Sequence, residues 1–320
     1  MEEKYKISKV DDYDLWEKFE NESPQSSIYS SVESIKLFKK NINLYSISKG
    51  AQIKSLIYLY VDKKIILSEP LIYSGLLFQP QRQQKNCRYI AEKFRLTEIF
   101  IDHILKEYKN LEINLHYNIK DVRAFQWFNY HELNKPKFKT EIRYTSLINL
   151  KNKLLEDIFK NLDDVKQRDI KKCLKRTDLI INYDLDLESF KKNYINTMKK
   201  NNSDFFDKNL NTMMIFLEKI HLSGKAFQTN LIYKNKIIYS NLFSLHNNTA
   251  CYLYGAGDVD VSERLGGTYS LWKAIEKCYE KKIECVDLEG VNSPQRGSFK
   301  ISFGGNLANY YKVILNKEQL

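Results

Sequence analysis

Short apolar runs alternate along the chain with segments of helical spacing. Residues 53–61 and 111–116 are rich in Ile, Leu and Tyr, which is typical of buried strands. Between them, residues 88–105 repeat apolar side chains at helical intervals, which predicts an amphipathic helix. The alternation continues toward the C-terminus. The sequence therefore predicts an α/β (α+β) protein with mixed, mostly antiparallel central sheets that are flanked by helices.

The chain divides into two halves that join near residue 150. A short internal repeat supports this division, because residues 56–68 resemble residues 230–240. In both segments a strand containing Ile-Tyr leads to a lysine-containing turn, and Ile-Ile-x-Ser follows. Such repetition indicates a duplicated structural unit. We therefore predict two related domains, an N-terminal domain at 1–150 and a C-terminal domain at 151–320.

The second half has a regular order of predicted elements. Its first segment, 154–175, has an apolar stripe along its length and a densely basic end, which predicts one long helix. Further helices and a three-strand meander follow, the helices at 187–199 and 207–221 and the strands at 226–233, 237–245 and 250–254.

Eight of the 11 glycines lie in one C-terminal stretch, residues 252–311. Glycine allows positive φ and a close approach of backbone to a ligand, so this stretch is where we expect unusual backbone geometry. After the strand at 250–254, the pattern predicts a helix and two further strands, at 268–282, 283–288 and 299–303.

A glycine pair marks the place where a loop enters the helix at 268–282. Gly266, Gly267 and Thr268 form this entry, and Arg264 comes just before them. Free backbone N–H groups and the helix dipole favour an anion at such a position, commonly a phosphate. A tight turn with Thr268 as the N-cap and no ligand explains the same residues. The sequence fits both interpretations equally well.

Two carboxylates and a lysine are the candidates for chemistry. Asp287 and Glu289 lie at or just past the C-terminal end of a predicted strand, where ligands commonly bind in open α/β sheets. Either could accept a proton from an amine if burial raises its pKa toward neutrality. In the last predicted strand, alternation places Lys300 on the face opposite Phe299, where it could stabilise an oxyanion or a donor phosphate. Tyr254 could donate a hydrogen bond to a leaving group.

Composition narrows the compartment and the partners. The net charge of +11, from 51 basic and 40 acidic residues, favours anionic partners such as nucleotide phosphates, tRNA, coenzyme A or an anionic membrane surface. An AT-rich genome would also produce a lysine-rich chain. The five cysteines form no CxxC pair, the N-terminus has no apolar signal region, and no apolar run approaches a membrane span. We expect a cytoplasmic protein without a metal or a tightly bound cofactor.

The C-terminal stretch resembles one acyltransferase superfamily, the Fem-type aminoacyltransferases together with their acyl-CoA-dependent relatives of the GNAT (Gcn5-related N-acetyltransferase) type. The residues that carry the resemblance are Asp287-x-x-Gly290, Gly297-x-Phe299-Lys300-x-x-Phe303-Gly304-Gly305 and Tyr310. The resemblance implies tandem GNAT-like domains. It also implies transfer of an acyl group to an amine of a cell-envelope precursor, such as a nucleotide- or lipid-linked amino sugar.

The same resemblance assigns further residues and a donor. It implies that the segment from Arg264 to Thr268 holds the pyrophosphate of acetyl-CoA or another acyl-CoA. Aminoacyl-tRNA is the alternative donor, in a transferase that acts on a peptidoglycan precursor, and peripheral membrane contact is compatible with either. Substrate-binding roles are implied for four residues, Arg168, Asn292, Arg296 and Phe299. A competing class is a non-catalytic module that binds nucleic acid, but the aromatic residues lie mostly within apolar segments and do not interleave with Lys and Arg.

Overall fold

A computed structural model describes residues 4–81, 84–200, 210–261 and 265–316. Its contacts divide the chain into unit 1, Met1–Arg143 with Asn309–Leu320, and unit 2, Tyr144–Ala308. The chain passes from unit 1 into unit 2 within strand β7 (Lys139–Asn149) and returns within strand β13 (Asn306–Asn316). The chain thus changes unit at residues 143–144 and again at 308–309, and the last strand contributes to the first unit.

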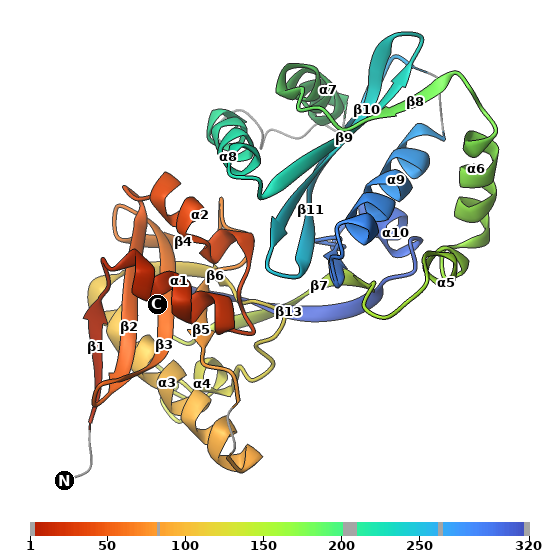
Figure 1. The fold of residues 1–320 in the computed structure, drawn as a ribbon. Helices are drawn as coiled ribbons and strands as arrows, with labels where there is room; N and C mark the ends of the chain where they lie inside the picture. The colour runs from red at the N-terminus through yellow and green to blue at the C-terminus, as the bar shows by residue number, and fades with distance from the viewer. Residues whose placement is uncertain (1–3, 82–83, 201–209, 262–264, 317–320) are drawn as a thin grey trace. The chain divides into compact units, whose positions relative to one another are not determined.

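Unit 1 is a sheet with helices on both faces (Figure 1, red to yellow). Its strands follow the order β1-β2-β3-β4-β6-β13, and β5 pairs with β3. Among the described residues of unit 1, neighbouring strands pair antiparallel, except β4 and β6, which pair in parallel. The elements are β1 (Tyr5–Lys9), α1 (Tyr13–Glu22), η1 (Ile28–Ser30), α2 (Val32–Leu37), β2 (Ile42–Lys49), β3 (Gln52–Asp62), β4 (Ile65–Leu67), β5 (Gly75–Phe78), α3 (Asn86–Glu107), β6 (Asn110–Asn114) and α4 (Arg123–Gln126).

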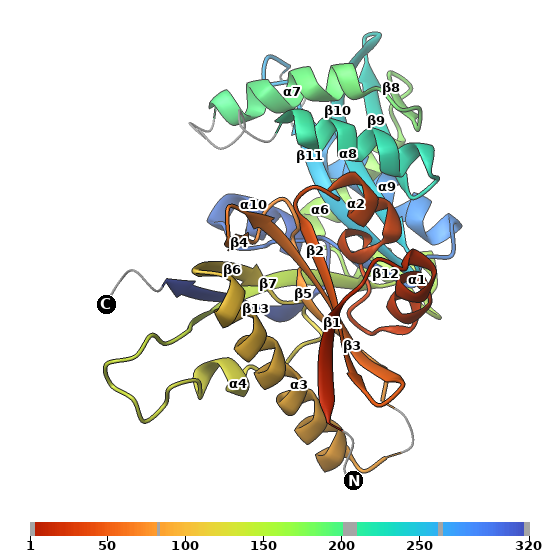
Figure 2. The same ribbon diagram turned by 90° about the vertical axis from the view of Figure 1, so that its left-hand side faces the viewer.

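Alternation along β3 decides which helix covers which face of unit 1. Ile57 and Leu59 are buried in one cluster with Phe100 of α3. Tyr58 points to the opposite face, where its ring meets Trp16 of α1 edge-on at 6.4 Å between centroids. Helix α3 therefore packs on one face and α1 on the other, and Figure 2 shows the length of α3 along the strands.

Unit 2 repeats this plan (Figure 1, green to blue). Its strand order is β7-β12-β11-β10-β9-β8. Among the described residues, neighbouring strands pair antiparallel, except β11 and β12, which pair in parallel. The remaining elements are α5 (Leu155–Lys160), α6 (Asp164–Leu174), β8 (Leu179–Asn182), α7 (Leu187–Lys200), α8 (Leu210–Leu222), β9 (Ala226–Tyr233), β10 (Lys236–His246), β11 (Thr249–Gly257), α9 (Gly266–Glu280), β12 (Cys285–Asp287) and α10 (Pro294–Ile301).

The internal repeat of the sequence corresponds to the same hairpin in each unit. Lys63 and Lys64 turn the chain between β3 and β4, with φ of 45° and 67°. Lys234 and Asn235 do so between β9 and β10, with φ of 49° and 59°. Positive φ at both central residues is the geometry of a two-residue hairpin turn that matches the twist of the strands.

Two predicted elements are wrong. The single helix at 154–175 is divided into α5 and α6, because the Asp163 side chain caps α6 by accepting a hydrogen bond from the Val165 N–H at 2.9 Å. The strand at 299–303 is instead the end of α10 and the turn after it. Pro294 occupies the first turn of that helix, and the rings of Phe299 and Phe303, four residues apart, meet at 5.3 Å.

Neither a membrane-spanning helix nor a metal-binding group of side chains is present among the described residues. No described helix combines the length and the hydrophobicity that crossing a membrane requires. Within the same residues, His, Cys, Asp and Glu side chains form no group of three or more that could hold a metal ion.

Candidate functional site

The site predicted at the end of β12 is built on a strained turn. Asp287, the last residue of β12, is 2% exposed and pairs across the parallel ladder with Cys251 of β11. Its carboxylate accepts hydrogen bonds from the Thr145 hydroxyl of β7 and from the Glu289 N–H, the latter at 2.8 Å. Glu289 itself has a φ of 55°, which is uncommon for a residue with a side chain. Asp287 thus fixes the turn that presents Glu289.

Glu289 titrates near neutrality. Burial raises the pKa of this carboxyl to about 7, and the Asp287 carboxylate also raises it, while Lys300 and Arg296 act in the opposite direction. A carboxyl group with such a pKa exchanges its proton at physiological pH, which is the property of a general base or acid. Strained backbone and a raised pKa therefore coincide at one residue.

Lys300 lies beside this turn, on α10. Its ammonium donates hydrogen bonds to the backbone carbonyls of Glu289 at 3.2 Å and Gly290 at 3.4 Å. It also lies 5.3 Å from the ring centroid of Tyr252, which is buried on β11. The lysine brings positive charge to the Glu289 carboxyl and holds the backbone of the turn in place. We refer to Asp287, Glu289 and Lys300 as the β12 cluster.

A second feature of unit 2 is a cavity of about 300 Å³ at the start of α9. Helix α9 begins at Gly266, and its N-cap residue, Leu265, provides no side-chain hydrogen bond, so Thr268 is not the N-cap. Lys166 of α6 faces the same cavity and donates a hydrogen bond to the Thr268 hydroxyl at 3.2 Å. Its ammonium also lies 4.8 Å from the ring centroid of Phe299. The cavity thus brings a lysine to the first turn of a helix, and its lining carboxylate, Asp258, is already paired with Lys236, an arrangement that suits an anion.

The glycine pair has a packing role as well. A Cβ at Gly267 would lie 3.1 Å from the ring of Tyr239, and one at Gly257 would lie 2.8 Å from it. A side chain at Gly257 would force the Tyr239 ring to shift, and one at Gly267 would crowd the same ring. The predicted anion-binding residue Arg264 lies outside the described residues.

Known structures share this architecture. No protein-family model matches the sequence, and no curated protein is detectably similar to it. Among solved structures, FemX superposes with a TM-score of 0.64 at 8% identity over 96% of both chains. A tandem GNAT protein from the clavulanic acid biosynthesis pathway gives 0.54 at 9% identity over 99% of both chains. L-PGS from Bacillus licheniformis gives 0.52 at 9% identity, over 97% of this chain and 93% of that one. The chain has the Fem-type tandem GNAT fold.

Within this Fem-type fold, the remaining predicted residues lie in separate places. Arg168 is exposed on α6, and Arg296 is exposed on α10, where its charge reaches Glu289. Asn292 exchanges hydrogen bonds of 2.8 and 3.1 Å with the backbone of β7, which indicates a structural role. Tyr254 packs edge-on against a tyrosine of α7 at 5.9 Å. The structure thus brings Asp287, Glu289 and Lys300 together, places Arg296 within electrostatic reach of them, and puts Phe299 at the α9 cavity.

The prediction missed two residues. Tyr252, two positions before Tyr254, lies beside Lys300. Lys166 faces the start of α9, but the sequence shows only that it belongs to a basic segment. Alternation in a regular strand would put Tyr252 and Tyr254 on one face, but β11 has a register shift between them: Leu242 pairs with Tyr254 and Phe243 with Tyr252.

Proposed function

We propose that the protein is an N-acyltransferase and that the β12 cluster of unit 2 is its catalytic centre. One observation carries the proposal: Glu289 has a pKa of about 7 and lies next to the Lys300 ammonium at the C-terminal end of β12. A carboxylate that accepts a proton at neutral pH is what an amine acceptor requires before it can attack. The shared fold with FemX and a tandem GNAT protein supports acyl transfer as the reaction class.

The reaction follows from these groups. The ionised Glu289 carboxylate takes a proton from the acceptor ammonium, and the free amine nitrogen attacks the acyl carbonyl carbon of the donor. A C–N bond forms, and the Lys300 ammonium stabilises the negative charge on the carbonyl oxygen. The C–S bond of a thioester, or the C–O bond of an ester, then breaks. The leaving thiolate or alkoxide takes up the proton that Glu289 holds, which restores the carboxylate, and the second proton, from the amide nitrogen, goes to solvent.

The α9 cavity supports acyl-CoA as the donor. Lys166, Gly266 and Gly267 line one space, so a pyrophosphate there would meet a cation and the first turn of a helix. The Asp258 carboxylate also lines this space, but it forms an ion pair with Lys236. Aminoacyl-tRNA is the alternative donor. As acceptor we propose an amine on a nucleotide- or lipid-linked amino sugar of the cell envelope, because the net charge of +11 suits a phosphorylated substrate. Both donors are cytoplasmic molecules, so we propose the cytoplasm as the location.

The test is a transfer assay on the full chain. Acetyl-CoA, longer acyl-CoAs and an aminoacyl-tRNA mixture are each incubated with a panel of amino-sugar nucleotides. Product formation is followed by the mass of the acylated amine, because the exposed thiol of Cys87 would react with reagents that detect released coenzyme A. We expect transfer from acyl-CoA, and a Lys166→Gln variant should raise KM for that donor more than it lowers kcat. Transfer from aminoacyl-tRNA alone would move the proposal to the alternative donor.

A matched pair of variants tests the assigned base. Glu289→Gln should lower kcat by roughly 10²- to 10⁴-fold at neutral pH. Glu218→Gln on the exposed face of α8 removes the same charge and should leave transfer unchanged. Full turnover by Glu289→Gln would refute the role of the β12 cluster, and absence of transfer from every donor would contradict the proposed reaction.

A further inference from the structure

One segment of unit 1, between α4 and β7, exposes large apolar and aromatic side chains. We refer to residues 127–138 as the aromatic loop, and Figure 2 shows this segment extending away from the sheet of unit 1, to the left of α4. Trp127, Tyr130 and Leu133 are 52%, 63% and 87% exposed. Three such side chains in solvent on one short loop indicate a surface that contacts something outside the chain.

The exposure does not result from a loosely held backbone. The Asn129 side chain donates a hydrogen bond to the Pro136 carbonyl at 2.8 Å, which joins the two sides of the loop. Within the turn, the Glu132 N–H donates a hydrogen bond to the Asn129 carbonyl at 3.0 Å. Asn129 has a φ of 52°, a conformation that asparagine adopts more readily than most residues. A defined turn therefore presents the outward side chains.

Inward-facing rings attach the loop to the core of unit 1. The rings of Phe128 and Phe138 meet at 5.3 Å between centroids, and Phe138 meets Phe125 of α4 at 5.3 Å. Phe125 and Phe138 both belong to the buried core. The Trp127 ring contacts Phe94 of α3 at 5.4 Å on one side and is half-exposed on the other. The loop thus divides its aromatic side chains between the core and the solvent.

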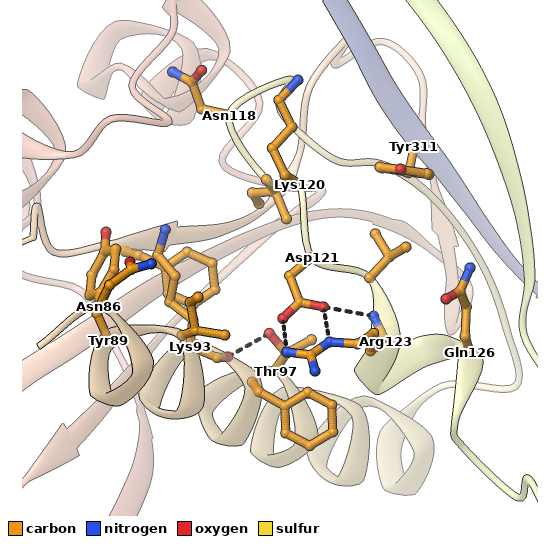
Figure 3. Close-up of a pocket in the computed structure, with 15 residues that line it drawn as sticks. Asn86, Tyr89, Lys93, Thr97, Asn118, Lys120, Asp121, Arg123, Gln126 and Tyr311 are labelled. Atoms are coloured by element: carbon orange, nitrogen blue, oxygen red, sulfur yellow. Dashed lines mark hydrogen bonds and ion pairs between the residues drawn. The ribbon is translucent and has the colours of Figure 1, made fainter.

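Arg123 fixes the start of the loop. Its guanidinium lies 5.3 Å from the centroid of the Trp127 ring. The Asp121 carboxylate holds that guanidinium with two hydrogen bonds of 2.7 and 2.8 Å. Figure 3 shows this pair in the wall of a cavity that Lys93 and Lys120 also line. Trp127 is therefore positioned by a cation whose charge is already paired.

The charged residues of the loop and its end are mainly basic. Residues 127–139 contain three lysines, Lys135, Lys137 and Lys139, and one acidic residue, Glu132. Lys135 pairs with Glu132 and Lys139 with Glu141, whereas Lys137 forms no ion pair among the residues that the structure describes. Exposed pairs of this kind are weak, so the lysines can exchange their partners for other anions.

This combination fits a lipid bilayer better than a protein partner. Trp and Tyr are enriched at the membrane–water interface, leucine adds apolar area below it, and lysines are attracted to anionic head groups. A stable protein interface buries roughly 800 Å² on each partner, whereas the apolar part of the loop consists of three side chains. Apolar side chains at the end of a projecting loop, with lysines beside them, match an apolar layer that lies beneath an anionic surface.

We propose that the aromatic loop attaches unit 1 to the surface of a membrane that contains anionic lipids. Trp127, Tyr130 and Leu133 enter the interfacial layer of the bilayer, and the lysines of the loop contact the head groups. Attachment to a membrane goes beyond the proposed acyl transfer, because it does not depend on activity in unit 2 or on the identity of donor and acceptor.

Tryptophan fluorescence of the full chain provides a direct assay. Of the three tryptophans, Trp16 and Trp272 are 0% and 2% exposed, so Trp127 supplies the response to an added surface. The probes are vesicles of phosphatidylglycerol and phosphatidylcholine in equal parts, and vesicles of phosphatidylcholine alone. Co-sedimentation measures binding, and the blue shift of the emission together with quenching by brominated lipids measures insertion.

The apolar contribution is tested with variants that keep the reporter. Tyr130→Ser/Leu133→Ser retains Trp127 and should raise the Kd for the mixed vesicles roughly tenfold or more. Leu222→Ser is the matched control, because it makes the same change at a leucine that is 77% exposed at the end of α8. It should bind the mixed vesicles as tightly as the wild type. Thermal midpoints show that each variant is folded.

The charge contribution has its own matched pair. Lys135→Gln/Lys137→Gln should weaken binding to the mixed vesicles roughly tenfold. Lys39→Gln/Lys40→Gln removes the same charge from exposed positions of unit 1 between α2 and β2 and should leave binding unchanged. Equal losses in the two variants would show that net charge alone causes binding, which would overturn the proposal.

The wild type should bind the mixed vesicles with a blue shift and quenching of the Trp127 emission, and should bind phosphatidylcholine vesicles more weakly. The proposal is overturned if the wild type does not sediment with the mixed vesicles, or if it binds them without a change in emission. It is also overturned if Tyr130→Ser/Leu133→Ser binds as tightly as the wild type. An emission shift that appears without vesicles as the protein concentration rises would identify a second copy of the chain as the occupant of the loop and would likewise overturn it.

Discussion

Replacing Glu289 by glutamine should stabilise the protein while it removes activity. The folded-state pKa of about 7 lies well above the 4.5 of an unperturbed glutamate. At about 1.36 kcal/mol for each pKa unit, the ionised carboxylate costs the folded state up to about 3 kcal/mol. Glutamine has nearly the same shape and no charge, so Glu289→Gln should recover much of this free energy.

The pH dependence gives the sign of the effect. Because the folded chain holds the proton more tightly than the unfolded chain, the wild type loses stability as pH rises from about 4.5 to about 7. Below pH 4.5 the carboxyl is protonated in both states, and the variant should be as stable as the wild type. The difference should grow through that window and stay constant above it.

The assay is urea unfolding of both proteins at several pH values between 4 and 8.5, with Glu218→Gln measured in parallel. Equal m-values are required before the midpoints are compared. A Glu289→Gln protein that is no more stable than the wild type at pH 8 would refute the raised pKa. Glu289 would then lack the near-neutral pKa on which its role as the base depends.

Three further predictions test the surroundings of the site. Lys300→Met should lower kcat. It should also move the rise of the pH–rate profile to higher pH, because Lys300 lowers the pKa of Glu289. A profile that rises at the same pH as in the wild type would contradict this. Gly224→Ala should lower the free energy of unfolding by ~1–2 kcal/mol, because its φ of 73° is unfavourable for alanine. Gly304→Ala should lower it by ~2 kcal/mol more, because the added Cβ would also lie 2.3 Å from a backbone oxygen. Equal losses of stability in thermal unfolding would disprove this steric explanation. Asp163→Ala should cost ~1 kcal/mol through loss of the α6 cap, and an unchanged midpoint in denaturant would show that the cap is dispensable.

In unit 2, the sequence predicted best those elements whose apolar residues follow a single spacing, either that of a strand or that of a helix. The meander β9–β11 has apolar runs with turns at Lys234 and Asn247, and both turn residues have positive φ. The segment 299–303 shows the limit of the method. Apolar side chains at every second position fit a strand, but the outer two, Phe299 and Phe303, also fit a helix, and the proline at the start of α10 favours the helix.

Side chains that meet only through tertiary structure could not be predicted in the same way. Lys93 and Lys120 belong to segments whose sequence shows ordinary solvent-facing lysines, and only the packing of unit 1 puts them in one cavity. The bulge in β11 had a similar consequence, because it separated the expected Tyr254 from the site and left Tyr252 beside Lys300. An irregularity of one residue in a strand leaves no mark on the hydrophobic pattern.

Glu289 shows how much a sequence can indicate about a site. Its position after a buried strand marked it as a candidate, but many carboxylates follow strands and only cap turns. Glu289 differs from these carboxylates because it lowers the stability of the folded state. Its backbone has a left-handed conformation, and its carboxyl is harder to ionise than in water. Asp287 and Lys300 both hydrogen-bond the backbone of Glu289 and so maintain this arrangement. A protein that retains a destabilising residue, together with two charged residues that hold it in place, has the pattern expected where function opposes stability.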